Sequence, residues 1–126
     1  TVFDEDCNRV AKASGFFFNR RIVVGPAFYG LPKRQQDAVI AHEEGHCKGW
    51  HFELRLLMLP LFWTRWAQKL AIRQELAADA YAVSRGFGVE LLHFLAHDSG
   101  GEFYPCPALR ARVLRRRIKE HCDATA

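Results

Sequence analysis

The chain lacks long hydrophobic runs, internal repeats, low-complexity segments and linkers. Its longest uninterrupted apolar stretch, Leu56 to Trp63, contains Pro60. A helix that spans a bilayer needs about 20 apolar residues, so this sequence contains no membrane-spanning segment. Because nothing divides its 126 residues, we expect one folded domain over residues 1–126, large enough to bury a core but too small for two.

Paired-cysteine motifs are also missing. The cysteines lie far apart, and no two have the C-x-x-C spacing of a zinc knot or a redox pair. Their even number permits two disulfides, but the sequence carries no secretory signal. We therefore expect reduced thiols and a cytoplasmic location for Cys7, Cys47, Cys106 and Cys122.

An excess of charge of one sign occurs only near the end of the chain. The net charge is +4, and the basic residues that follow Leu109 account for it. A basic terminal helix could bind nucleic acid or an anionic membrane. It has no interleaved aromatic residues for base stacking, and Val113, Leu114 and Ile118 would turn one face to the core. We expect a solvated helix and no nucleic-acid partner; the alternative is a basic helical nucleic-acid binder with incidental histidines.

What the sequence does contain is the pentapeptide His42-Glu43-Glu44-Gly45-His46. On a helix, residues four apart share a face, so His42 and His46 would direct both imidazoles at one point. Glu43 would lie about 100° further round, beside a bound ion rather than on it. Imidazoles bind Zn²⁺, the ion acidifies its water, and an adjacent carboxylate can remove the proton. The spacing predicts a catalytic zinc site with Glu43 as general base; chance spacing on a surface helix is the alternative.

A third ligand is available on a second helix. No Gly or Pro occurs between Thr64 and Arg85, which predicts a long helix that carries Glu75. Asp79 lies one turn beyond Glu75 on the same face. We interpret Glu75 as the third ligand of one zinc ion per chain, and Asp79 as the acceptor that orients a ligand imidazole. The alternative for Glu75 is a solvated carboxylate paired with Lys or Arg.

The two motifs, His42 to His46 and Glu75-Leu76-Ala77-Ala78-Asp79, resemble the gluzincin metallopeptidases of the HtpX and CAAX-prenyl-protease type. In size the chain is closest to their small soluble relatives, the minigluzincins. The family patterns H-E-x-G-H and E-x-x-A-D both match without a gap. The resemblance implies an α+β, mainly helical, minimal gluzincin (zincin-like) domain with an active-site helix, a Glu-bearing helix and a small β-hairpin or sheet. It also implies a zinc-dependent endopeptidase that hydrolyses peptide bonds of peptides or proteins through a metal-bound water activated by Glu43.

Family members often carry H-P-x-x-x-x-R after a Gly-rich loop. Here Gly100-Gly101 is followed by Pro107 and Arg112 in register, with Cys106 in place of the histidine. The resemblance implies Arg112 as a catalytic residue that stabilises the oxyanion of the transition state. The other candidates for that role are His93, His97, Tyr81 and Tyr104.

The start of the chain predicts a short helix and a hairpin. Asp4 to Ser14 has an acidic first turn and is followed by Gly15, which favours a helix. Phe16-Phe17-Phe18 and the segment from Arg21 then read as two strands around a tight turn at Asn19-Arg20. In gluzincins an edge strand beside the zinc accepts an extended peptide. The resemblance implies this role, with an ordinary core strand as the alternative, for Arg21, Ile22, Val23 and Val24.

The remaining segments predict further helices. Pro32 favours a helix start, and this helix would run through the zinc motif to about His51. Val89 to His97 predicts a fourth helix. The hydrophobic segment Leu54 to Trp66 is expected to pack across the back of the active-site helices. A substrate groove, a membrane-interface contact or a protein contact are its alternatives.

A second class of function uses the same residues. The chain could be a zinc-containing binding or regulatory protein, a latent or inactive peptidase fold that acts through protein–protein contacts. Glu43 argues against this reading, because a structural zinc site needs no carboxylate beside the ion and usually closes with a fourth protein ligand. His121 or Cys122 could supply that ligand if the end of the chain folds back.

Overall fold

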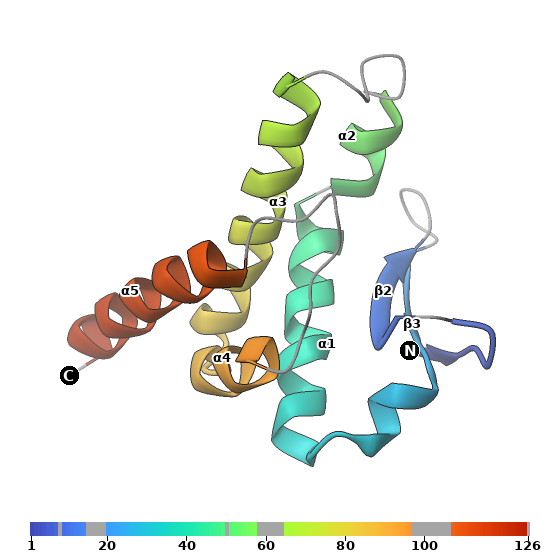
Figure 1. Ribbon diagram of the computed structural model, residues 1–126, viewed down its shortest axis with the longest axis horizontal. Coiled ribbons are helices and arrows are strands. Elements are labelled where there is room, and N and C mark those ends of the chain that lie inside the picture. Colours follow the sequence, from blue (N-terminus) through green and yellow to red (C-terminus); the bar gives the residue numbers. More distant parts are fainter. Residues whose placement is uncertain (8, 15–19, 50, 58–64, 97–106, 126) are drawn as a thin grey trace.

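The computed structural model describes residues 1–7, 9–14, 20–49, 51–57, 65–96 and 107–125. It is an α+β structure, mainly helical, with one small sheet (Figure 1). The strands are β1 (Val2–Phe3), β2 (Ala11–Ser14) and β3 (Arg21–Val24). A 3₁₀ helix, η1 (Pro26–Gly30), leads to the helices α1 (Lys33–Lys48), α2 (His51–Leu57), α3 (Arg65–Ser84), α4 (Gly88–Ala96) and α5 (Pro107–Thr125).

Helix α1 lies between the sheet and the helices α3, α4 and α5 (Figure 1). On one side Val39 packs with Ala11, Ile22, Val24 and Phe28 of the sheet and η1. On the other side a second apolar cluster joins α1 to the remaining long helices through Ala38, Ala41, Ala82, Val83, Leu91, Leu95 and Leu114. The apolar residues of α1 thus follow the helical period on two faces, which fixes the rotation of α1 about its axis.

The sheet has the order β1-β3-β2. β1 pairs with β3 in parallel, with Val2 opposite Val23, and β2 pairs with β3 in antiparallel fashion, with Ala13 opposite Ile22. The strand predicted at Arg21 to Val24 is therefore confirmed. Its antiparallel partner is Ala11–Ser14, whereas the predicted partner, Phe16 to Phe18, and the turn residue Asn19 lie outside the described residues.

The helix predicted over Asp4 to Ser14 is wrong. The Asp4 N–H donates to the Val24 carbonyl at 3.0 Å, and the Gly25 N–H donates to the Val10 carbonyl at 3.0 Å. The Asp4 side chain accepts the Asp6 N–H at 3.0 Å, which makes a local turn of the acidic residues. Pairing with β3 therefore outweighs the local helical preference of this segment.

The boundaries of the longer helices agree with those predicted from the sequence, except at the end of α1. α3 covers the predicted segment, and α4 corresponds to the predicted fourth helix, of which His97 lies outside the described residues. The helix expected to reach His51 ends at Lys48, where the Gly49 N–H donates to the Gly45 carbonyl at 3.0 Å. His51 instead begins α2.

The hydrophobic segment Leu54 to Trp66 differs from its expected packing where the structure describes it. Leu54, Leu57 and Trp66 are exposed, so the ends of the segment do not pack across the back of the active-site helices. Residues 58–64 lie outside the described part. None of the described helices is both long and apolar enough to cross a bilayer. The three cysteines that the structure describes, Cys7, Cys47 and Cys122, are free.

Candidate metal centre

The site forms where α1 and α3 approach closely. A Cβ atom on Gly45 would lie 2.9 Å from the Ala78 Cα and 3.0 Å from the Tyr81 Cβ. Real Cβ atoms do not come this close to backbone, so a glycine at this position sets the separation of the two helices. The short distance brings the histidines of α1 opposite the carboxylates of α3.

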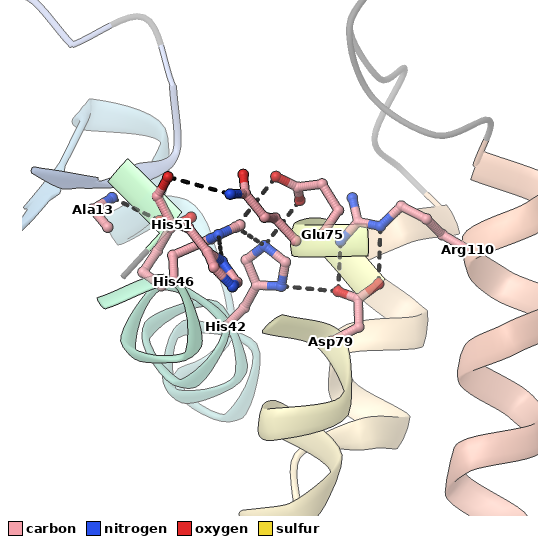
Figure 2. A network of polar contacts seen from close by, with 9 residues as sticks. Ala13, His42, His46, His51, Glu75, Asp79 and Arg110 are labelled. Carbon is pink, nitrogen blue, oxygen red and sulfur yellow. Dashed lines mark hydrogen bonds and ion pairs between the residues drawn. The ribbon is translucent and has the colours of Figure 1, made fainter. Parts of the chain in front are cut away.

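The three predicted ligands converge (Figure 2). The Nε2 atoms of His42 and His46 are 3.2 Å apart. Glu75 places Oε2 at 3.3 Å from Nε2 of His42 and Oε1 at 3.2 Å from Nε2 of His46. Within the described residues, these three side chains form a group whose ligand atoms, all within 4.8 Å of one another, could hold a metal ion.

This spacing fits zinc. With bonds of about 2.0–2.1 Å, a tetrahedral zinc ion separates its ligand atoms by roughly 3.3–3.4 Å. The two imidazole Nε2 atoms are 3.2 Å apart, and each lies at a similar distance from a Glu75 oxygen, His42 from Oε2 at 3.3 Å and His46 from Oε1 at 3.2 Å, so each of these separations is close to that value. The donor set of two imidazoles and one carboxylate is also the one that catalytic zinc sites use, with a fourth position left for water or substrate.

Asp79 lies where the sequence predicts the partner of a ligand imidazole. Its Oδ1 is 2.8 Å from Nδ1 of His42, and only 2% of the residue is exposed. Arg110 of α5 donates to both carboxylate oxygens, from Nη2 at 2.7 Å and from Nε at 3.0 Å (Figure 2). A partner at Nδ1 leaves Nε2 of His42 directed at the place that a metal ion would occupy.

The oxyanion-stabilising role predicted for Arg112 is contradicted by its position, and the arginine that contacts the site, through Asp79, is Arg110. Arg112 is exposed. It lies about 200° around the helix from Arg110, so its side chain points away from Asp79. After Gly100-Gly101 the family spacing of a proline five residues before an arginine occurs twice, at Pro107 and Arg112 and again at Pro105 and Arg110. The second register would have found Arg110.

The structure adds His51 to the site, a residue that no sequence motif indicated. Its Nδ1 lies 2.8 Å from Nδ1 of His46, and 7% of the residue is exposed. In a continuous helix, five residues would place His51 about 140° from His46. The helix instead ends at Lys48, and the break before α2 brings the two rings together.

Glu43 connects the centre to the sheet. Its Oε2 accepts a hydrogen bond from the Ala13 N–H at 2.7 Å. The strand that contacts the predicted general base is therefore β2. Because residues of a strand alternate in direction, the backbone groups of Ala11 and Ala13 share the edge of β2 that faces away from β3.

The assignment of Arg21, Ile22, Val23 and Val24 to a peptide-accepting edge strand is therefore wrong. β3 is the central strand, with β2 on one side and β1 alongside Val23 and Val24 on the other. Three of its residues, Ile22, Val23 and Val24, are buried, which corresponds to the alternative of a core strand. The edge interpretation failed because the chain start forms β1 instead of a helix.

Opposite charges at the centre shift the pKa values of its groups. Burial lowers the pKa of His42, but the carboxylates of Asp79 and Glu75 outweigh this effect and raise it to about 10. Burial raises the pKa of Glu75 and of Asp79, but His42, with His46 beside Glu75 and Arg110 beside Asp79, holds both pKa values below their ordinary range. In the absence of an ion, a proton on His42 therefore compensates the carboxylates, and a divalent cation can replace it.

The end of the chain does not fold back onto the site. α5 contacts Asp79 near its start, and its C-terminal end points away from α1 (Figure 1). With a rise of about 1.5 Å per residue, His121 lies roughly 16 Å further along the helix than Arg110. Cys122 is exposed. Neither residue is in the position of a fourth ligand, which a structural zinc site would use.

Comparison of the chain with protein-family models, curated proteins and solved structures gave no match. The nature of the centre is therefore inferred from its donor atoms, their spacing and the neighbouring carboxylate.

Proposed function

We propose that the protein is a zinc-dependent endopeptidase of the gluzincin type. His42, His46 and Glu75 bind one zinc ion, and Glu43 is the general base. The proposal depends above all on the convergence of two imidazole nitrogens, 3.2 Å apart, with the Glu75 carboxylate, whose two oxygens lie 3.2–3.3 Å from them. Two imidazoles and one carboxylate are the donor set of a zinc ion that keeps an open position for water. The carboxylate of Glu43, next to His42, supports a role of the ion in hydrolysis and not in structure alone.

The ion, when bound, supplies Lewis acidity towards the scissile carbonyl and towards a water molecule. The protein fixes the orientation of its ligand atoms. Asp79 takes the Nδ1 side of His42 at 2.8 Å, so that Nε2 remains a ligand atom. Arg110 in turn fixes both oxygens of Asp79. This limits rotation of the Asp79 carboxylate and of the His42 ring that it contacts.

Glu43 accepts the proton of the attacking water and passes it to the leaving amine nitrogen. One of its oxygens is held by the Ala13 N–H at 2.7 Å, which orients the carboxylate and leaves the second oxygen for proton transfer. β2 lies at an edge of the sheet. We propose β2, in place of β3, as the strand that pairs with an extended peptide or protein substrate.

The test combines metal analysis with a peptide-cleavage assay on wild type, Glu43→Ala and Glu43→Gln. We expect about one zinc per chain in all three proteins, because Glu43 is not a ligand. Cleavage should fall by about 10²–10⁴-fold in both variants. Glu44→Gln is the matched control, since the Glu44 side chain is 39% exposed and lies near Arg85.

Two results would contradict the proposal in different ways. Wild type without bound zinc would overturn the metal centre. Wild type that binds zinc but cleaves no peptide or protein would favour the alternative, a zinc-containing binding or regulatory protein.

A further inference from the structure

His51 lies at the start of α2, shortly after the end of α1. Its ring and that of His46 are nearly perpendicular, with centroids 5.0 Å apart and an interplanar angle of 76°. We propose that His51 is a positioning residue of the metal centre: it accepts a hydrogen bond from Nδ1 of His46 and so directs Nε2 of His46 at the ion. This inference rests on the metal centre proposed above.

The same arrangement occurs at the other ligand histidine. Nδ1 of His42 lies 2.8 Å from Asp79 on α3, and Nδ1 of His46 lies 2.8 Å from Nδ1 of His51 on α2. A neutral imidazole carries one N–H and one acceptor nitrogen. When Nε2 of His46 is a ligand, its Nδ1 carries the proton and donates to Nδ1 of His51. Each ligand ring is thus held at its outer nitrogen by a residue from another helix.

The backbone of His51 is fixed by the helix that supplies the carboxylate ligand. Gln74, which precedes Glu75 on α3 and is buried, donates from Nε2 to the His51 carbonyl at 3.3 Å. One turn of α3 therefore presents Glu75 to the ion and holds His51 behind His46. A residue that only filled space would not need this polar link to the site.

Gly49 provides room for the His51 ring. A Cβ atom at this position would lie 2.2 Å from Nε2, 2.6 Å from Cδ2 and 2.8 Å from Cε1 of His51. Any side chain at residue 49 would thus displace the imidazole from its place beside His46. The substitution Gly49→Ala therefore displaces the His51 imidazole and leaves its ring nitrogens in the protein.

The test measures zinc affinity, by competition with a chelator, for His51→Leu, His51→Asn and Gly49→Ala. We expect His51→Leu and Gly49→Ala to bind zinc about 10–100-fold more weakly than wild type. His51→Asn retains an acceptor oxygen close to the position of Nδ1, so its loss should be smaller. The rise in Tm caused by a fixed zinc concentration should follow the same order.

Two matched controls separate positioning from general destabilisation. His93→Leu changes an exposed histidine, and Gly30→Ala adds a Cβ atom that meets nothing within 4 Å. Both should bind zinc as wild type does. If His51→Leu and Gly49→Ala retain wild-type zinc affinity, the positioning role is refuted, even if their metal-free Tm falls. If wild type itself binds no zinc, the proposed metal centre fails, which is a separate result.

Discussion

Asp79 is the residue at which charges from two other helices meet. It contacts His42 of α1 at 2.8 Å and Arg110 of α5 at 2.7 Å. Both pairs are almost fully buried. Removal of one partner from a buried pair costs about 3–5 kcal/mol, because the remaining charge stays uncompensated. We therefore expect Asp79 to contribute both to the free energy of unfolding and to metal affinity.

The first prediction separates these two contributions. Asp79→Ala should lower the free energy of unfolding by about 3–5 kcal/mol and weaken zinc binding about 10–100-fold. Arg110→Met should lower stability but change zinc affinity less, since Asp79 still contacts His42. Urea unfolding and chelator competition measure the two quantities.

Arg112→Met is the control for this prediction. Arg112 is exposed, so its substitution should change the free energy of unfolding by less than about 0.5 kcal/mol. A larger effect at Arg112 than at Arg110 would contradict the assignment of Arg110 to the site.

At this scale the sequence predicted the residues whose relation depends on helical spacing alone. His42 and His46, or Glu75 and Asp79, lie four residues apart on one helix, and the structure brings these pairs together as predicted. His51 was not predictable in the same way, because its position depends on where α1 ends. Arg110 was missed because two registers of one spacing were available, and the contact with Asp79 distinguishes them.

At the scale of elements, the contact between α1 and α3 determines the geometry of the centre. The Gly45 Cα faces Ala78, which is fully buried. Alanine favours a helix over glycine by about 1 kcal/mol, but insertion of a methyl group into a packed interface costs about 1–3 kcal/mol. The steric cost should prevail, because the nearest atom to the added group belongs to the backbone.

Gly45→Ala is therefore expected to lower stability by up to roughly 2 kcal/mol as the net of these two effects. It should also weaken zinc binding, since Glu75 moves away from the imidazoles when the helices separate. Thermal unfolding with and without zinc measures both changes. Unchanged zinc affinity in a folded Gly45→Ala protein would show that the helix separation does not set the ligand spacing, and Gly30→Ala again serves as the control.

Elements were predictable where the local pattern and the packing agree. α3 has favourable residues throughout and an unbroken helical run, and it forms as predicted. The chain start has a local pattern typical of a helix, yet its backbone pairs with β3. Strand order depends on contacts between distant residues, so the sequence could not show that β3 is central and β2 lies at the edge.

At the scale of the whole molecule, the buried charges predict how stability depends on pH without metal. The pKa values of Glu75 and Asp79 lie below their ordinary values of 4.5 and 3.8, so their contribution is present above these values and is lost as the pH falls. The pKa of His42 rises from 6.5 to about 10, so its contribution is complete below 6.5 and is lost as the pH rises through 10.

The metal-free protein should therefore be most stable between about pH 4.5 and 6.5. Tm measured against pH in the presence of a chelator checks this expectation, and a Tm that rises from pH 6.5 to 10 would contradict it. With saturating zinc the alkaline decline should disappear, because the ion replaces the His42 proton. Acid should then release the metal, since the ligands must be deprotonated to bind it.

The charges around the centre have one more consequence. Glu43, Glu75 and Asp79 each contribute one negative charge and Arg110 one positive charge, so a divalent ion would make the group electrically neutral. Most of the other basic residues of α5 lie on its later turns, from Arg115 to Lys119, and a Debye length of about 8 Å at physiological salt weakens their effect on the centre. Long-range attraction would then contribute little to the capture of a peptide, whatever its own charge. Selection among peptides would fall to short-range fit along β2.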